Sequence, residues 1–400
     1  MKDFTKALYA DLLHRIDVVI DDLNRTDHHE DIKDRFIALT LKDIHEIRTV
    51  LQNSFDSGIL EFEELTGNNL HLFNKSNREF KAIHSYRYLA IKNYGKPEVF
   101  FFRLISQIYD EHRINARAPI VSTISNHDYY YWAVPYYEMI ALPSGEENSL
   151  LNLPDIYHEI GHLLHIMFNG GSCESSTSII DKHFQKEMVR VEDEGIGEHY
   201  LPILEEAKYL WASSWLEEFT CDLVGTYMTG PAYAWTNLKL LSTGHGSSKI
   251  FESSDSHPAD EARMTIILLM LEKLGLSEDK EKIEASWKVF LKDTEVFRPK
   301  EHSLIYPTKL LQVIVDEFYQ YYNNADLASY PELLASGNIS ISQVLNEAWT
   351  FAQNDPGQYF SYETSAICDL KKRFNIEDAV EGTLTVSEQT SGSEIVIRNS

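Results

Sequence analysis

The residues of this 400-residue chain best suited to chemistry form one short run, His158-Glu159-Ile160-Gly161-His162. Two histidines four residues apart lie on one face of a helix, where both imidazole rings can bind a single tetrahedral metal ion. Glu159 lies one step round the helix from His158, so its carboxylate can reach a water molecule beside the metal rather than the metal itself. There it can take a proton from that water and later give it to the leaving amine. The run therefore predicts a zinc-dependent hydrolase with His158 and His162 as metal ligands and Glu159 as general base.

A catalytic zinc ion normally has three protein ligands, and the sequence offers a third ligand downstream. Within Leu216–Gly225, Glu218 and Asp222 are four residues apart and share a helical face. We expect Glu218 to complete the metal site, and Asp222 to accept a hydrogen bond from the second ring nitrogen of a ligand histidine. Glu217 is the alternative third ligand, but it faces away from Asp222. The other interpretation is a solvated acidic helix face, against which the apolar flanking residues argue.

A third polar element follows at Ser256–Met264, where His257 precedes Pro258 and Arg263 lies six residues after His257. A His or Arg placed across from the metal can stabilise the negative charge that develops on the carbonyl oxygen during hydrolysis. The alternative is that His257 caps its own helix and Arg263 forms a surface ion pair.

The chain thus carries three motifs in order: His-Glu-x-x-His, Glu-x-x-x-Asp and His-Pro-x-x-x-x-Arg. Together they resemble the motifs of the soluble relatives of the HtpX and CAAX-prenyl-protease family of gluzincin metallopeptidases. The resemblance covers roughly 137–274, about a third of the chain. Two departures matter. Cys221 stands where that family usually has Ala, and the chain lacks the membrane helices of the membrane members, so membrane or prenylated substrates are not implied. The roles that the resemblance implies are zinc ligation by His158, His162 and Glu218, the general base at Glu159, a supporting carboxylate at Asp222, and contact with the substrate and its oxyanion at His257 and Arg263.

The elements that must position these residues are predominantly helical. Apolar spacing predicts two helices within 1–58 and two more over 79–94 and 97–115, whereas 66–69 and 74–77 are rich in turn-forming residues. β-branched and aromatic residues predict a small sheet, with extended segments at 120–124, 129–134 and 137–142. The predicted fold class is α+β, predominantly α-helical, with a gluzincin-like core in which the sheet precedes the metal helix. The predicted divisions are a helical region at 1–115 that recognises or covers the substrate, a catalytic domain at 116–376, and a polar tail at 377–400.

Peptidases of this type bind a peptide as an additional strand on an exposed sheet edge just before the metal helix. Main-chain pairing at such an edge provides affinity without selecting a sequence. The alternative is an ordinary core strand. The residues that the resemblance places on the edge are Met139, Ile140, Ala141 and Leu142.

Composition restricts the partners and the compartment. A formal net charge of −26 argues against a nucleic-acid-binding surface, since phosphate binding requires clustered Lys and Arg. Cys173, Cys221 and Cys368 are too few and too scattered for a disulfide framework, which favours a reducing compartment. The N-terminal segment carries acidic residues among its apolar positions, so it is not expected to be a secretory signal. No apolar run approaches the length of a membrane span. We expect a cytoplasmic protein whose partner is a peptide or protein, without nucleic acid or membrane.

Two further residues near the motif receive minor roles. His165 is expected on the helix surface rather than as a fourth ligand. Cys173 follows two glycines and a serine and is expected in a flexible loop, where blocking of the zinc by its thiolate is a remote alternative.

The sequence thus favours a zinc metallopeptidase, an endopeptidase rather than an exopeptidase, with one zinc ion per chain. Two other classes stay open. A degenerate zincin would act as a metal-binding or protein-binding scaffold or sensor without catalysis, although a scaffold has no need of Glu159. A helical interaction protein with a chance motif would bind no stoichiometric metal.

Overall fold

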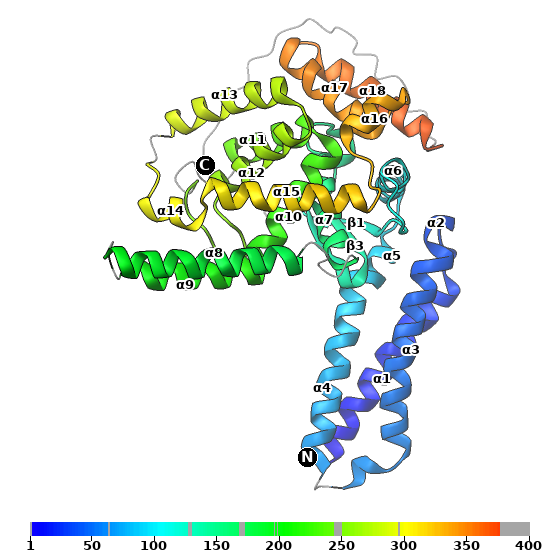
Figure 1. The fold of residues 1–400 in the computed structure, drawn as a ribbon. Coiled ribbons are helices and arrows are strands. Elements are labelled where there is room, and N and C mark those ends of the chain that lie inside the picture. The colour runs from blue at the N-terminus through cyan, green and yellow to red at the C-terminus, as the bar shows by residue number, and fades with distance from the viewer. Residues whose placement is uncertain are drawn as a thin grey trace, which may run out of the picture.

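The computed structural model describes residues 2–62, 65–126, 130–167, 173–195, 197, 199–243, 250–294 and 297–376. The predicted polar tail at 377–400 lies outside these residues. Within them the protein is predominantly helical with one three-stranded sheet, which confirms the α+β class at this level (Figure 1). No helix in the described ranges combines the length and the apolar character needed to cross a membrane.

Long helices of the N-terminal region form an arm that projects from the body of the molecule (Figure 1). The two helical runs predicted before Gly58 are confirmed, over 2–25 and 30–56, although the second run is divided by a π-helical turn. Gly58, which follows the second run, adopts a φ of 70° that favours glycine. The elements of the arm are α1 (Lys2–Arg25), α2 (Glu30–Ile32), the π-helical η1 (Lys33–Ile37), α3 (Ala38–Asp56), the 3-10 turn η2 (Ile59–Glu61) and α4 (Thr66–Ile83).

The turns predicted at 66–69 and 74–77 are wrong, since both segments lie within α4. Asn69 and Ser76 are buried, and the Asn69 carbonyl oxygen accepts a hydrogen bond of 2.9 Å from the Tyr9 hydroxyl of α1. Packing against α1 and α3 therefore outweighs the weak helix propensity of these polar residues.

Three further helical segments lie at the base of the arm: the π-helical η4 (His84–Tyr88), α5 (Leu89–Lys92) and α6 (Lys96–Glu111). The buried Arg87 forms an ion pair with Asp43 of α3 and donates to the Tyr137 carbonyl oxygen at 3.5 Å. Arg35 likewise donates to the Ala118 carbonyl oxygen at 2.8 Å. These contacts hold the arm against the sheet.

The sheet contains β1 (Ile120–Ser125), β2 (Trp132–Val134) and β3 (Met139–Pro143) in the order β1-β3-β2. β3 is parallel to β1 and antiparallel to β2, so its backbone is paired on both sides. The edge role predicted for Met139, Ile140, Ala141 and Leu142 is therefore wrong: they form the central strand and are fully buried. Met139 and Ala141 belong to the core shared with the arm, whereas Ile140 and Leu142 belong to the larger core of the body.

The body is built around α10 (Leu216–Thr229), in which every residue except Glu217 is buried. α10 crosses α7 (Asp155–Met167) on one side and packs on α12 (Asp260–Lys273) on another. It continues from α9 (Tyr200–Leu210) through η7 (Trp211–Trp215), a π-helical turn. α6 also contributes to this larger core, through Phe101 and Leu104 among others.

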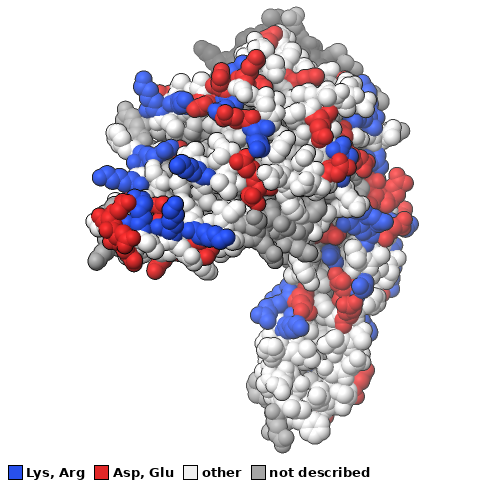
Figure 2. Space-filling view, in the orientation of Figure 1, with Lys and Arg blue, Asp and Glu red and all other residues white. Residues whose placement is uncertain are grey.

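The remaining helical elements of the body are η5 (Pro135–Tyr137), η6 (Glu146–Asn148), α8 (Cys173–Glu194), α11 (Pro231–Thr243), α13 (Ser277–Asp293), α14 (Lys300–Ile305), α15 (Thr308–Asn324), α16 (Tyr330–Ser336), α17 (Ile341–Asn354) and α18 (Tyr359–Arg373). In the view of Figure 2, acidic and basic side chains lie interspersed over the body without a continuous basic patch. This distribution gives no support to a nucleic-acid surface on that face.

Candidate metal centre

The crossing of α7 and α10 creates the centre, and Gly161 makes this close crossing sterically feasible. A Cβ atom on Gly161 would lie 2.7 Å from the Cα atom of Cys221, closer than packed atoms allow. Because the two backbones approach this closely, His158 and His162 on α7 lie directly over the acidic face of α10.

Glu218 faces both histidines, as predicted. Its Oε2 atom lies 3.5 Å from Nε2 of His158, and its Oε1 atom lies 3.6 Å from Nε2 of His162. These separations are long for N–H···O hydrogen bonds. Two nitrogen or oxygen ligands bound to one tetrahedral zinc ion lie about 3.4 Å apart, given the usual bond lengths. Each histidine nitrogen thus lies at about that distance from one oxygen of Glu218, with a different oxygen facing each ring.

Glu217, the alternative third ligand, occupies a different position. Its Oε1 atom lies 2.9 Å from Nδ1 of His162, the ring nitrogen opposite the one that faces Glu218. Hydrogen bonding to His162 lowers the pKa of Glu217. An N–H at Nδ1 that donates to this carboxylate fixes the ring and leaves Nε2 available for a metal.

Asp222 supports His158 in the same way, and two residues from other helices hold Asp222. Nδ1 of His158 lies 3.1 Å from Oδ1 of Asp222, which also accepts a hydrogen bond of 2.6 Å from the Tyr233 hydroxyl. Arg263 donates through Nε and Nη2 to the two carboxylate oxygens of Asp222, at 2.8 and 2.7 Å. The contact between Asp222 and a ligand histidine was predicted, but Tyr233 was not. Nothing in the sequence around Tyr233 indicates its contact with Asp222.

Arg263 does not occupy the position expected of a residue that contacts the substrate. Two of its three guanidinium nitrogens bind Asp222, and its side chain is only 16% exposed. His257 does lie at the mouth of the site: its side chain is 56% exposed, and its Nε2 atom is 3.7 Å from Oε2 of Glu218. Burial lowers the pKa of His257, which favours the neutral ring. The Ser256 hydroxyl lies 2.8 Å from Nδ1 of this ring.

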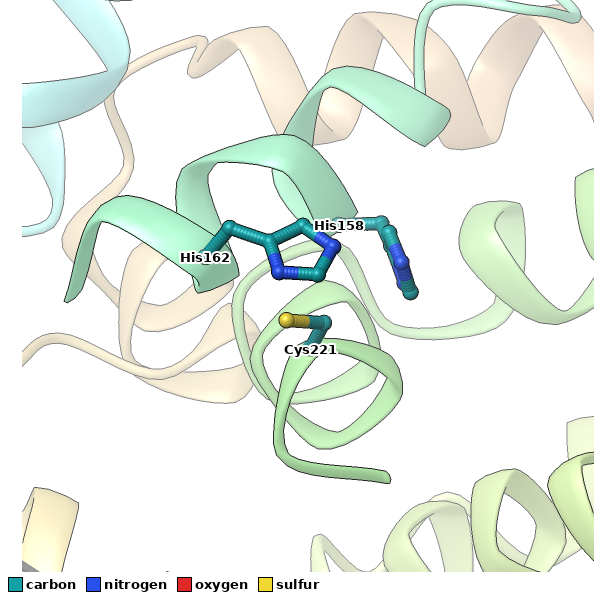
Figure 3. Close-up of side chains that lie close together, drawn as sticks. All are labelled: His158, His162 and Cys221. Atoms are coloured by element: carbon teal, nitrogen blue, oxygen red, sulfur yellow. The ribbon is translucent and has the colours of Figure 1, made fainter. Parts of the chain in front are cut away.

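Cys221 is a second candidate for the third ligand, and the sequence analysis assigned it no such role. Ligand atoms of His158, His162 and Cys221 all lie within 4.8 Å of one another, and this group could bind a metal (Figure 3). The residue follows Glu218 by three positions and so shares its helical face, which is the signal that could have identified it. A thiol must lose its proton to bind a metal, whereas burial near several carboxylates raises the pKa of Cys221 well above its usual value.

Two buried carboxylate oxygens show that the residues present fit a cation. Oε2 of Glu159 and Oε2 of Glu218 are buried and have no hydrogen-bond partner. Burial raises the pKa of Glu159. Burial acts in the same direction on Glu218, but the nearby charges of His158 and Arg263 outweigh it and lower the pKa of Glu218. Burial lowers the pKa of His158, but hydrogen bonding to Asp222 outweighs burial and raises it to about 10, so the protonated ring balances the charge of Glu218. A metal ion between the histidines and Glu218 would take over that role.

One further acidic residue lies beneath the centre. Asp155, the first residue of α7, is buried and accepts a hydrogen bond of 2.9 Å from the Tyr130 hydroxyl. Burial raises the pKa of Asp155 to about 7. Its position one helical turn before His158 and Glu159 is the sequence signal that could have identified it.

His165 is half-buried on α7 and outside the group of ligand atoms, and the side chain of Cys173 lies outside the described part of the chain.

Comparisons with protein-family models, with curated proteins and with solved structures find no match to this chain. A function is therefore inferred from the chemistry and geometry of these residues alone.

Proposed function

We propose that the protein is a zinc-dependent metallopeptidase that hydrolyses peptide bonds at the crossing of α7 and α10. The observation that carries this proposal is the spacing of Nε2 of His158, Nε2 of His162 and the Glu218 carboxylate, at 3.5 and 3.6 Å. The orphaned carboxylate oxygen of Glu159 beside them supports it further, because a purely structural metal site has no need of a buried base.

A zinc ion held by His158, His162 and Glu218 would supply Lewis acidity, lowering the pKa of water and polarising a peptide carbonyl group. Glu159 takes a proton from the attacking water, and its raised pKa makes its carboxylate a better base. It then gives that proton to the leaving amine.

Two residues outside the ligand set complete the proposed mechanism. His257, at the open side, donates from Nε2 to the carbonyl oxygen as negative charge develops there, while Ser256 holds the other ring nitrogen. Arg263 acts as a positioning residue through Asp222 and His158 rather than by contact with the substrate.

Metal content tests the ligand set. We expect elemental mass spectrometry of the purified protein to find one zinc ion per chain. The Glu218→Ala variant should lose it, whereas Glu217→Ala and Cys221→Ala should retain it. Loss in Cys221→Ala with retention in Glu218→Ala would replace the ligand set by His158, His162 and Cys221. No zinc in any sample, even after titration, would leave a helical interaction protein as the better account.

Peptide cleavage tests the reaction. A quenched-fluorescent peptide library should be cleaved by the zinc-loaded protein, with internal rather than terminal bonds broken. Glu159→Gln should lower the rate at least about 100-fold while the zinc content is unchanged. Full activity in Glu159→Gln would disprove the assigned base. Zinc binding without cleavage by the unaltered protein would favour the scaffold or sensor.

A further inference from the structure

An open cavity of about 320 Å³ is lined by α9, η7, α14 and the segment 250–255. Its apolar lining includes Trp215, Phe251 and Tyr306. The rings of Trp215 and Tyr306 have centroids 5.3 Å apart, and both residues are buried. The cavity is thus a firmly packed aromatic pocket rather than a gap between mobile side chains.

Three carboxylates also line this cavity and are free to bind a ligand. They belong to Glu206 of α9, Asp255 of the 250–255 segment and Glu301 of α14. No Lys or Arg is among the lining residues; Arg298, which lies over the Phe251 ring, pairs with Glu261. No hydrogen bond or ion pair engages the three carboxylates within the described ranges. Unpaired carboxylates around aromatic walls provide a negative potential that attracts a cation.

A buried, neutral histidine also forms part of the cavity wall. His302 lines the cavity and is only 3% exposed, yet neither ring nitrogen has a hydrogen-bond partner. Its Nε2 atom is 3.3 Å from Glu261 without the geometry of a hydrogen bond. Burial lowers the pKa of His302 to about 4, so the neutral ring does not offset the carboxylates.

The cavity is connected to the metal centre by a short, firmly held segment. The Trp215 indole donates to the Ser254 carbonyl oxygen at 2.8 Å, and the His257 backbone N–H donates to the Ser254 hydroxyl at 3.0 Å. The three residue steps from Ser254 to His257 span at most about 11 Å. Trp215 also precedes Glu218 by one helical turn. A peptide bound at the centre can therefore place a side chain in the cavity from a residue close to the cleaved bond.

We propose that this cavity is a substrate subsite that binds the basic side chain, Lys or Arg, of the peptide. The inference rests on the proposed peptidase function. The aliphatic stem of the side chain packs on the aromatic walls, and its charged end reaches the carboxylates at the rim. A purely apolar side chain would fill the walls but leave the carboxylates unpaired.

Matched peptides test the subsite through catalysis. Peptides that carry Lys or the uncharged norleucine at each position near the cleaved bond have the same side-chain length, so their kcat/KM ratio measures the effect of charge. We expect at least about a tenfold preference for Lys at one position. The double variant Asp255→Asn/Glu301→Gln should lower that ratio at least about fivefold. Glu205→Gln, which removes a neighbouring carboxylate of α9 outside the cavity, should leave the ratio unchanged.

A binding measurement separates the failure of this inference from the failure of the peptidase proposal. Ligand-observed NMR with the Glu159→Gln protein compares Nα-acetyl-arginine amide with Nα-acetyl-citrulline amide, which differs in the loss of charge. We expect binding of the arginine compound only, abolished in Asp255→Asn/Glu301→Gln. Equal binding of both, or cleavage with no preference for Lys or Arg, overturns the subsite even if the protein is a peptidase. Selective arginine binding by a protein that cleaves nothing keeps the pocket and removes the peptidase.

Discussion

The absent side chain of Gly225 in α10 leaves the space in which the ring of Tyr233 lies. A Cβ atom at Gly225 would come within 2.9 Å of three carbon atoms of that ring. Because the Tyr233 hydroxyl donates to Asp222, and Asp222 contacts His158, the missing methyl group helps to fix the orientation of a proposed metal ligand.

Substitution of Gly225 by Ala should therefore disturb the metal centre as well as the core. The ring of Tyr233 must shift to avoid the new methyl group, at an expected cost of about 1–3 kcal/mol in the free energy of unfolding. Zinc affinity should fall with it. Urea unfolding and competition with a chelator measure the two effects. Gly67→Ala in α4 is the control, since nothing lies within 4 Å of its Cβ position, and it should be neutral or stabilising.

Removal of the Tyr233 hydroxyl should weaken zinc binding without unfolding the protein. Tyr233→Phe keeps the ring but deprives Asp222 of a donor, and loss of such supporting contacts typically lowers metal affinity about 10- to 100-fold. Tyr227→Phe is a matched control, because its buried hydroxyl donates to the Leu327 carbonyl oxygen instead. Equal affinities in the two variants would contradict a positioning role for Tyr233.

The pair of Arg263 and Asp222 allows stability and metal affinity to be separated. Arg263→Met leaves the buried Asp222 carboxylate without its cation and should destabilise the metal-free protein by about 3–5 kcal/mol. Adding Asp222→Asn removes the uncompensated charge, so the double variant should recover much of that stability. Its zinc affinity should stay low, because the amide supports His158 less well. Urea unfolding in the presence of chelator, followed by zinc titration, would show whether the two properties part in this way.

His112 should make the protein less stable as the pH falls below neutrality. This buried ring lies with Nδ1 2.7 Å from the Ala328 carbonyl oxygen, and burial lowers its pKa from 6.5 to about 4. The unfolded chain therefore binds the proton first. The stabilising contribution is complete above pH 6.5 and is lost as the pH falls toward 4, by about 3 kcal/mol in total.

The loss from pH 7 to pH 5 should be smaller in His112→Asn, whose amide can donate to the same carbonyl oxygen but does not titrate. Urea midpoints of both proteins at the two pH values, in the presence of chelator, provide the measurement. Parallel pH profiles would show that His112 does not cause the effect.

The sequence was informative wherever a feature depends on residues close together in the chain. Helical spacing in the first 58 residues and β-branched segments after 119 predicted the helices before Gly58 and the small sheet. The spacing of His158 and His162, and of Glu218 and Asp222, predicted which faces of α7 and α10 meet. These predictions succeeded because helical periodicity alone determines which side chains share a face.

The failures involve contacts between distant parts of the chain. The order β1-β3-β2 places the third strand in the centre, and nothing in its sequence distinguishes a central strand from an edge strand covered by helices. The polar start of α4 became helical through burial against α1. Arg263 reaches Asp222 from α12, 41 residues along the chain, and even Tyr233, in the helix that directly follows, contacts Asp222 only because α11 folds back on α10.

The π-helical turn η7 has a consequence for how the two ends of one long helix are oriented. Each residue of an α-helix turns the chain by about 100°, and a π-turn closes its hydrogen-bonded ring around one more residue. The segment before the turn packs on α8, while the segment after it directs Glu218 toward α7. The wide turn thus changes the rotation of α10 about the helix axis relative to α9, which an unbroken α-helix would fix. Deletion or insertion of a single residue in η7 would mainly rotate the acidic face of α10 away from α7, rather than change the length of the helix.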